Sequence, residues 1–402
     1  MLLAAVDPAT TLAIVVAGAV AGTVSALLGD RGVLVPAVVV ELLIGVVIGP
    51  DVLGIHVSDV MSFLASLGLG LLFFFAGYEI DIQRIRGEPL RLALLGWIIS
   101  LALAYTIGGV LAWAGVVLSL VYTGSAMATT AIGTLIPILS DTGELHTRLG
   151  RYLLAAGAAG EFGPILLLTL VLSTQGALHN SIILLTFIGL AVGVALAVTR
   201  SSHHLLPMLE QTIEKSSQLA VRWIVVLVFA LALLASELGL DLLLGGFAAG
   251  MITRLLLRET EVRGFDSKLT AVGFGFFIPF FFVVSGMQID IDALFGSASA
   301  IAKIFLFFGL FLVVRGVPAL VLYRSVLDGS ERRALALFCA TQLPMVLAIT
   351  TVARDTGHMR ASTAASLVGA AVLSTLLFPM LGLRMRGAAR RSTDASPVEM
   401  PA

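Results

Sequence analysis

The sequence predicts an all-α membrane protein of about thirteen transmembrane helices, and three observations support this fold class. Hydrophobic residues occupy 58% of the 402 positions and charged residues only 12%, whereas ordinary soluble domains carry about 25% charged residues. About thirteen apolar runs approach the roughly 20 residues that a helix needs to cross the hydrocarbon core of a membrane. Lys and Arg residues also alternate between dense and sparse loops along the chain.

Glycine, proline and short polar clusters separate the apolar runs and set their limits. The segment before the first run, MLLAAVDPATT, has Asp7 where a secretory signal would carry Lys or Arg, so we expect the first helix to remain in the mature chain. The predicted spans, in chain order, are 10–29, 33–50, 60–79, 90–114, 117–139, 150–173, 181–199, 221–238, 241–257, 270–288, 302–323, 334–353 and 361–383.

The distribution of positive charge predicts the orientation of these spans, because cytoplasmic loops of membrane proteins are enriched in Lys and Arg. With the N-terminus outside, 20 of the 24 Lys and Arg residues fall on the cytoplasmic side and three on the opposite side. One missed helix would exchange the sides of every later loop and destroy this asymmetry. We therefore expect a multi-pass protein of the cell inner (plasma) membrane, with its N-terminus outside, its C-terminus cytoplasmic and lipid around it.

Two sequence segments recur about 200 residues apart and predict an internal repeat. ELLIG at 41–45 reappears as DLLLG at 241–245, and FFFAGYEIDI at 73–82 reappears as FFFVVSGMQIDI at 280–291. Spans one to six would then correspond to spans eight to thirteen, with the seventh as a linker helix. A shift of seven helices reverses the direction of each counterpart. Two such inverted-topology six-helix repeats are typical of secondary transporters, which expose one site to either side of the membrane.

Two ionisable residues lie deep within apolar runs, where a charge costs several kcal/mol. Glu161 lies about nine residues into its apolar stretch, which at about 1.5 Å per residue is about 14 Å and close to the middle of a core roughly 30 Å thick. Arg315 lies at comparable depth in IFLFFGLFLVVRGVPALVLY. We expect these two residues to face a cavity or each other; the alternative is that they form only a tethering salt bridge.

Glu161 is the candidate for a group that binds either a proton or a monovalent cation, with Arg315 as its charge partner. A carboxyl group withdrawn from water favours its protonated form, and a dehydrated Na⁺ competes for the same oxygen atoms. Competition for one site is sufficient for antiport. Gly160, Gly163 and Pro164 would loosen the helix around Glu161 and free backbone carbonyl groups for an ion.

Interrupted helices are predicted in two corresponding spans, which is the best sequence indication of a transporter's binding site. The fifth span reads YTGSAMATTAIGTLIPIL and the twelfth LFCATQLPMVLAIT. The alternative for the threonines of the fifth span is ordinary helix packing through their hydroxyl groups. The candidate ligands and supporting residues in these spans are Ser125, Thr129 and Thr130, and Thr341, Gln342 and Pro344.

Other classes of protein fit the sequence less well. Glu41 also lies within a span, and its preferred interpretation is a hydrogen-bonded or water-facing carboxylate without a transport role. A channel would display a repeated filter, and an enzyme would need a nucleophile with a base or a metal cluster, whereas every His lies outside the apolar spans. The net charge of −1 gives no reason to expect nucleic acid. The sequence therefore favours a transporter without a cofactor, not an enzyme.

Four segments occur in an order that is specific when they are taken together. They are ELLIGVVIGPDVLG (41–54), LGLGLLFFFAGYEID (67–81), GRYLLAAGAAGE (150–161) and PFFFVVSGMQID (279–290). With the Thr-rich fifth span, they make the chain resemble the second monovalent cation:proton antiporter family, the Kef-type Na⁺/H⁺ and K⁺/H⁺ exchangers, over nearly all of residues 10–385. The resemblance implies a homodimer that serves pH homeostasis by alternating access. We expect Na⁺ or Li⁺ to exchange for H⁺; the alternatives are K⁺/H⁺ exchange and a channel-like or non-transporting relative.

The resemblance also implies a division of the chain into a dimerisation side and a moving core. The expected segments are 1–89 for dimerisation-side helices one to three, 90–175 for core helices four to six with Glu161, 176–220 for linker helix seven and a cytoplasmic loop, 221–300 for dimerisation-side helices eight to ten, 301–385 for core helices eleven to thirteen, and 386–402 for a disordered cytoplasmic tail.

The chain departs from the family pattern at the candidate site. Relatives commonly carry Asp-Asp or Asn-Asp where this chain has Gly160 and Glu161, and often Lys where Arg315 stands. A buried Lys can release a proton, whereas Arg stays charged. One titrating carboxylate beside a fixed cation predicts one proton per transported cation, and hence electroneutral exchange.

Overall fold

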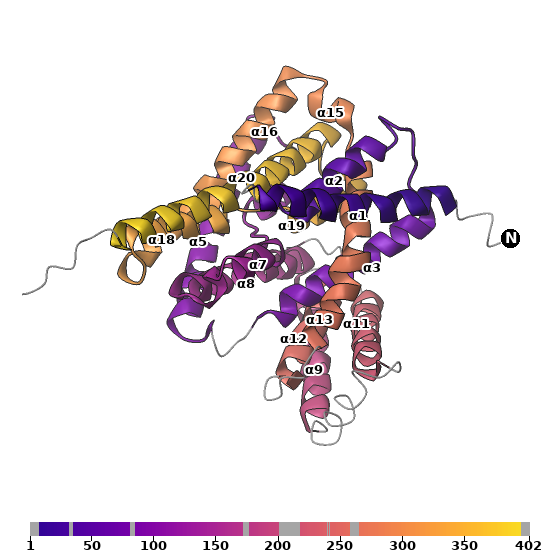
Figure 1. Ribbon diagram of the computed structural model, residues 1–402, viewed down its shortest axis with the longest axis horizontal. Coiled ribbons are helices and arrows are strands. Elements are labelled where there is room, and N and C mark those ends of the chain that lie inside the picture. The colour runs from indigo at the N-terminus through magenta and orange to yellow at the C-terminus, as the bar shows by residue number, and fades with distance from the viewer. Residues whose placement is uncertain are drawn as a thin grey trace, which may run out of the picture. The chain divides into compact units, whose positions relative to one another are not determined.

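The computed structural model is helical in every regular element of the residues that it describes (Figure 1). These residues are 8–31, 35–80, 85–171, 177–200, 218–238, 240, 242–257 and 265–394. Helices overlap all thirteen predicted spans. The number of helices that cross the membrane and the inverted repeat stay predictions. The predicted cytoplasmic loop falls largely on 201–217, outside the described residues.

The chain divides into two compact units, and the first contains the described residues within 1–33, 37–83 and 165–289. Helices α9, α11 and α12 contact one another and lie together in the lower part of Figure 1. The elements of this unit, besides the last residues of α8, are α1 (Pro8–Asp30), α2 (Ala37–Ile48), α3 (Asp59–Tyr78), α9 (Ala177–Arg200), α11 (Leu219–Glu237), α12 (Leu242–Leu257), α13 (Phe265–Val272), the π-helix η3 (Gly273–Phe277) and α14 (Ile278–Met287).

The second unit contains the described residues within 34–36, 84–164 and 290–402. In it, α20 packs against α16 and α18, and α5 packs against α6. The elements are α5 (Glu88–Trp113), α6 (Leu120–Met127), α7 (Ile132–Asp141), η2 (Glu144–His146), α8 (Arg148–Val171), α15 (Ile291–Phe295), α16 (Ala298–Phe311), the π-helix η4 (Leu312–Gly316), α17 (Val317–Leu322), η5 (Tyr323–Ser325), α18 (Gly329–Cys339), α19 (Pro344–Asp355) and α20 (Ala361–Asp394). The dimerisation and core roles expected from the sequence stay predictions.

Glycine residues let helices of the first unit approach at backbone distance. A side chain at Gly45 of α2 would overlap the carbonyl group of Val283 on α14, and one at Gly286 would overlap that of Leu42. Helices α3 and α12 meet in the same way at Gly77. Small residues at such contacts are typical of helices that pack within a lipid environment. These glycines therefore serve packing within the chain.

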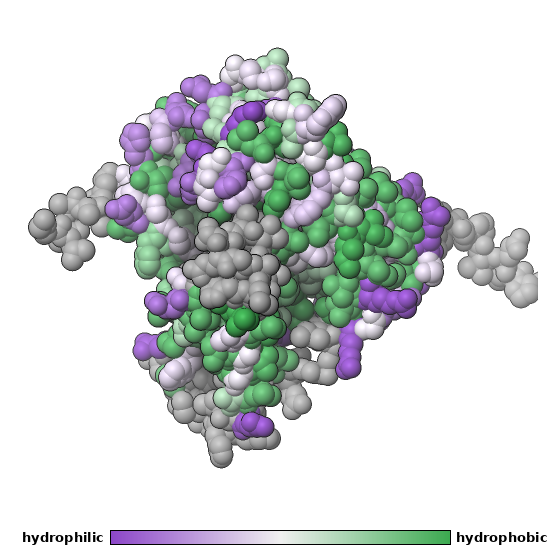
Figure 2. Space-filling model, turned by 180° about the vertical axis from the view of Figure 1, so that it is seen from behind, coloured by the Kyte–Doolittle hydropathy of each residue, from purple (hydrophilic) through white to green (hydrophobic). Residues whose placement is uncertain are grey.

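The apolar helices and their exposed side chains show that the chain is a multi-pass membrane protein. Large hydrophobic side chains face outwards, with Leu12 62%, Leu185 67% and Phe305 64% exposed. Hydrophobic atoms, coloured green, cover much of the face in Figure 2. Among the described residues, the helices long and apolar enough to span a membrane are the seven at Thr10–Gly29, Asp59–Tyr78, Glu88–Trp113, Ser267–Met287, Ala298–Ser325, Gly329–Asp355 and Ala361–Arg386.

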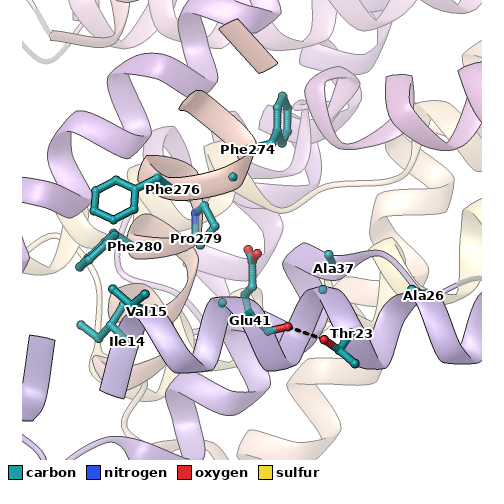
Figure 3. Close-up of a pocket in the computed structure, with 14 residues that line it drawn as sticks. Ile14, Val15, Thr23, Ala26, Ala37, Glu41, Phe274, Phe276, Pro279 and Phe280 are labelled. Atoms are coloured by element: carbon teal, nitrogen blue, oxygen red, sulfur yellow. Dashed lines mark hydrogen bonds between the residues drawn. The ribbon is translucent and has the colours of Figure 1, made fainter. Parts of the chain in front are cut away.

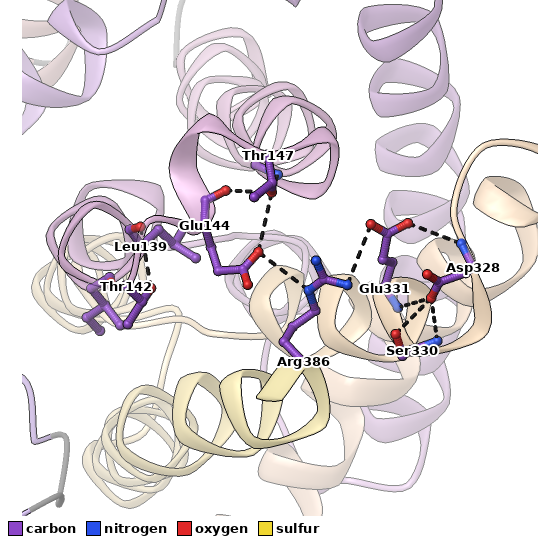
Figure 4. A network of polar contacts seen from close by, with 10 residues as sticks. Leu139, Thr142, Glu144, Thr147, Asp328, Ser330, Glu331 and Arg386 are labelled. Atoms are coloured by element: carbon purple, nitrogen blue, oxygen red, sulfur yellow. Dashed lines mark hydrogen bonds and ion pairs between the residues drawn. The ribbon is translucent and has the colours of Figure 1, made fainter. Parts of the chain in front are cut away.

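The last helix extends further than the sequence predicted. Helix α20 continues to Asp394, so the prediction of a disordered tail from residue 386 is wrong for the nine residues up to that point; 395–402 lie outside the described part of the chain. Arg386 Nε lies 3.4 Å from Glu144 Oε2, and Arg386 Nη1 lies 3.6 Å from Glu331 Oε1 (Figure 4). These acidic partners stand far away in the sequence, so local composition could not reveal the contacts that hold this end of the helix.

Asp328 caps the N-terminus of α18, next to this ion-pair network (Figure 4). Its Oδ1 accepts hydrogen bonds from the backbone N–H groups of Ser330 and Glu331, each at 2.8 Å. The bond from the Glu331 N–H is the largest cause that holds the pKa of the Asp328 carboxyl below its ordinary value. The capping contribution is therefore present above the unfolded-state pKa and is lost as the pH falls through the folded-state pKa.

We expect Asp328→Ala to lower the free energy of unfolding by about 1 kcal/mol at neutral pH, because two N–H groups lose their acceptor. The measurement is the melting temperature of the detergent-purified protein as a function of pH. The gap between wild type and Asp328→Ala should narrow towards about pH 3, below the ordinary pKa of aspartate. Asp328→Asn keeps a capping oxygen and serves as the control. If the melting temperatures of wild type and Asp328→Ala differed by the same amount at neutral pH and near pH 3, the capping role of the Asp328 carboxylate would be contradicted.

Candidate functional site

Two interrupted helices form the centre of the second unit. Residues 128–131 separate α6 from α7, and residues 340–343 separate α18 from α19. The N–H of Ala131 donates a hydrogen bond to the carbonyl of Thr341 at 2.8 Å, which joins the two breaks. Pro344 begins α19, where its missing N–H costs no helical hydrogen bond. The interruptions predicted in the fifth and twelfth spans are confirmed.

Glu161 lies on α8 with only 1% of its surface exposed. Its carboxylate faces the backbone N–H groups of Ile132 and Gly133, the first residues of α7. A helix N-terminus carries partial positive charge and N–H groups without helical partners, so α7 stabilises negative charge on Glu161. Glu161 Oε2 has no hydrogen-bond partner among the described residues. The carboxylate thus faces the N-terminus of α7, and Oε2 is open to a proton or a cation.

Pro164 determines how α8 joins the first break. Helix α8 runs without interruption from Arg148 to Val171, so the loosening predicted around Glu161 does not break the helix. Pro164 has no N–H to offer the carbonyl of Gly160, four residues earlier. That carbonyl instead accepts a hydrogen bond from the N–H of Thr130 at 3.1 Å. The carbonyl released by proline is therefore present, as the sequence predicted, but the backbone of the break occupies it.

Arg315 lies in η4, is 4% exposed and binds the first break. Nε donates to Thr130 Oγ1 at 2.9 Å, Nη1 to Ser100 Oγ at 3.3 Å and Nη2 to the carbonyl of Ala156 at 3.1 Å. Within the part of the chain that the structure describes, no ion pair joins Arg315 to Glu161. The tethering salt bridge considered from the sequence is therefore not formed, and a role as charge partner at longer range stays a prediction.

Gly160 and Gly163 make room for large side chains on neighbouring helices. A Cβ atom at Gly160 would lie 2.8 Å from Thr130 Oγ1 and would overlap the guanidinium of Arg315. A Cβ atom at Gly163 would overlap the ring of Trp97. The guanidinium thus fills the space that a side chain before Glu161 would need, which gives a physical reason for glycine at this position.

The hydroxyl groups proposed as cation ligands have different surroundings. Thr130 Oγ1 donates to the carbonyl of Cys339 at 2.6 Å, so this side chain links the first break to the last residue of α18. Thr129 Oγ1 donates to the carbonyl of Ala126 in the preceding helix at 3.0 Å. Ser125 Oγ lies 3.2 Å from the hydroxyl oxygen of a tyrosine on α5. Coordination of an ion by any of these hydroxyls stays a prediction.

Gln342 connects the second break to its surroundings and leaves one acceptor available. Nε2 donates to the carbonyl of Met127 at 2.9 Å, and the backbone N–H donates to Ser374 Oγ at 3.0 Å. The carbonyl of Gln342 accepts from Thr375 Oγ1 at 3.2 Å. Gln342 Oε1, like Glu161 Oε2, is buried without a hydrogen-bond partner in the described residues. Buried acceptors without donors favour a cationic or protonated occupant.

Helix α5 contributes three side chains that sequence reasoning missed: Trp97, Ser100 and Tyr105. Trp97 packs on Gly163, Ser100 binds Arg315, and Tyr105 is the tyrosine that contacts the α6 serine. The spacing of Trp97 and Ser100 could have indicated this, because residues three positions apart lie on the same face of a helix and can contact the same neighbours.

A helical membrane protein with two mutually bonded helix interruptions beside a buried carboxylate has the architecture of a secondary transporter. The family model described as "Sodium/hydrogen exchanger, transmembrane" matches residues 12–383. The chain therefore belongs to the sodium/hydrogen exchanger transmembrane family. The resemblance to cation:proton antiporters predicted from the sequence is confirmed at this level.

Matches to individual proteins support the same family assignment. The high-affinity Na⁺/H⁺ antiporter NhaS3 of Synechocystis is 25% identical over 357 residues, covering 86% of this chain and 76% of NhaS3. YjbQ of Bacillus subtilis is 25% identical over 366 residues, and the match spans 86% of this chain but only 58% of YjbQ. The structure of the sodium proton antiporter MjNhaP1 from Methanocaldococcus jannaschii matches with a TM-score of 0.64 at 19% identity, over 95% of each chain. That likeness shows a common fold.

Proposed function

We propose that this protein is a secondary antiporter that exchanges a monovalent cation, with Na⁺ or Li⁺ favoured, for H⁺ by alternating access. The observation that carries the proposal is the buried carboxylate of Glu161, whose Oε2 has no partner in the described residues while α7 orients the group. Membership of the sodium/hydrogen exchanger family supports it. Glu161 is the single exchanging group in this proposal, and transported Na⁺ and H⁺ are its ligands.

Charge explains why such a site exchanges its ligands. An ionised carboxylate inside a membrane protein carries an unfavourable charge unless it is neutralised. A proton or a monovalent cation neutralises Glu161 equally, but the two compete for the same oxygen atoms. The loaded site can therefore change its side of exposure at lower cost than the empty one. This difference couples the outward movement of one ion to the inward movement of the other.

The surroundings of Glu161 support exchange of one proton per cation. Gly160 supplies no second carboxylate, and the guanidinium of Arg315 fills that space. Arginine keeps its positive charge at all physiological pH values, so Arg315 adds no second proton. The site then carries the same net charge with either ligand, and we infer electroneutral exchange.

The same site chemistry supports a second candidate, K⁺/H⁺ exchange, since a carboxylate and neutral oxygens bind either ion. A channel-like or non-transporting relative is a third. The proposal places the protein in the inner (plasma) membrane, with the N-terminus outside and the C-terminus in the cytoplasm, as a homodimer that contributes to pH homeostasis. The positive-charge asymmetry of the loops supports this orientation.

The test is proton flux in proteoliposomes with an acidic lumen and a fluorescent pH probe. We expect Na⁺ or Li⁺ added outside to dissipate the pH gradient, with K⁺ slower and choline without effect. An imposed membrane potential should leave the rate unchanged if exchange is electroneutral. Dissipation by K⁺ alone would select the second candidate. A potential-dependent rate would refute the one-to-one ratio, and flux that needs no cation would contradict antiport itself.

A further inference from the structure

A pocket in the first unit shares no lining residue with the proposed exchange site. It is formed by α1, α2, η3 and α14, and its volume is about 600 Å³ (Figure 3). Small residues hollow it out, including Gly18, Gly22, Ala37 and Gly275. A Cβ atom at Gly22 or Gly275 would meet no heavy atom within 4 Å. Such a volume falls in the range of small-molecule sites and far exceeds that of a bare alkali ion.

Glu41 is the one ionisable residue among those that line the pocket. Only 5% of its surface is exposed, and Glu41 Oε2 has no hydrogen-bond partner within the described residues. Figure 3 shows the carboxylate leaving α2 in the direction of Pro279. A buried carboxylate without a partner is costly unless a proton or a positive charge joins it. The pocket therefore has a specific requirement for positive charge.

The remaining polar groups of the wall are acceptors. Thr23 Oγ1 gives its proton to the carbonyl of Ala19 at 2.8 Å, which leaves only lone pairs to face the pocket. In η3 the N–H of Ile278 bonds to the carbonyl of Gly273. The next residue, Pro279, has no N–H to offer the carbonyl groups in this turn. A ligand of this pocket must therefore bring its own N–H donors.

Aromatic and aliphatic side chains make up the rest of the lining. The rings of Phe274, Phe276 and Phe280 line the pocket together with Ile14 and Val15. An aromatic ring attracts an ammonium group over its face, and the aliphatic side chains favour an apolar body. The combination of one carboxylate, acceptor oxygens and phenyl rings is complementary to an organic cation that is apolar apart from its amine.

We propose that this pocket binds a hydrophobic amine, whose protonated amino group pairs with Glu41 and whose apolar body contacts the phenylalanine rings. The inference is independent of the exchange reaction, because none of the pocket residues belongs to the candidate site around Glu161. A direct measurement can therefore show loss of amine binding while cation/proton exchange is retained, or loss of exchange while amine binding is retained.

The test uses purified protein in nanodiscs of phosphatidylcholine and two fluorescent probes. One probe is dansylated 1,6-diaminohexane, which carries a primary ammonium; the other is dansyl hexylamide, which has the same length and no charge. We expect Glu41→Gln, which keeps the side-chain volume, to weaken binding of the charged probe at least about tenfold and to leave the uncharged probe unaffected. Gly22→Leu, which fills open space, should weaken both probes. Glu237→Gln removes an exposed carboxylate of the same unit and is the matched control.

Several outcomes would overturn the proposal. Equal affinity of wild type and Glu41→Gln for the charged probe would remove Glu41 from the site. Displacement of the probe by Na⁺ but not by choline would indicate an inorganic cation site. Displacement by phosphatidylethanolamine in the nanodisc, with no displacement by free hexylamine, would indicate a lipid head group.

Melting temperatures of the variants equal to that of wild type establish that the differences in probe binding do not arise from misfolding.

Discussion

Replacing Glu161 by glutamine should abolish cation-dependent proton flux, with a loss of at least about 100-fold, equivalent to about 2.7 kcal/mol. Glutamine has nearly the same shape, and its amide oxygen can still face the N–H groups of Ile132 and Gly133. It cannot ionise, so neither a proton nor a cation can be exchanged on it. The variant should therefore fold normally and fail in transport. The measurement is the proteoliposome assay with Na⁺, at equal protein density.

Two further variants sharpen this result. Glu161→Asp keeps the carboxylate on a shorter stem and should retain part of the flux with weaker apparent cation affinity. Asp355→Asn removes an exposed carboxylate of the same unit and should behave like wild type. If Glu161→Gln moved protons as fast as the unmodified protein, another group would have to be the exchanging one, and the proposed mechanism would be wrong.

Arg315→Ala should lower the free energy of unfolding more than any other single change considered. The variant loses three hydrogen bonds, to Thr130, Ser100 and Ala156. Each bond from a charged donor contributes about 1.5–3 kcal/mol, and removing the guanidinium recovers part of its own burial cost, so we expect a net loss of about 3–5 kcal/mol. Thermal unfolding in detergent measures this loss, and transport should fall with it.

Arg315→Lys separates charge from geometry. Lysine keeps the positive charge, but its single ammonium cannot reach three partners that the guanidinium fork contacts in different directions. We expect an intermediate melting temperature and flux between those of wild type and Arg315→Ala. Arg354→Ala, at an exposed position in the last turn of α19, is the control. A melting temperature of Arg315→Ala equal to that of wild type would show that these bonds contribute little.

The sequence was most informative where physics allows few alternatives. Acids and bases are rare inside apolar helices because their burial is costly, so Glu161 and Arg315 could be found without a structure. Proline and threonine clusters likewise located the two interrupted helices. In each case the residue type alone narrowed the possible explanations.

The partners of these residues depended on information that a linear pattern lacks. Whether Arg315 binds an acid or a hydroxyl depends on the rotation of η4 about its axis, which the sequence does not specify. Ser100 looks like any lone hydroxyl in an apolar run until that guanidinium reaches it. The role of Gly160 as space for a neighbour, and not as a flexible joint, follows only from the close approach of a second helix. The end of α20 was missed for a similar reason, since Arg386 finds its acids far away in the chain.

Two of the bonds that join the breaks to each other and to α8 run from backbone to backbone, Thr130 N–H to Gly160 and Ala131 N–H to Thr341. Substitution of side chains at these positions leaves such bonds in place, except for proline at 130 or 131, which would delete a donor. These backbone hydrogen bonds are therefore kept in most mutants that change the side chains lining the site. Ion preference can diverge among descendants of this chain by exchanging side chains around Glu161 while the scaffold beneath them is inherited unchanged.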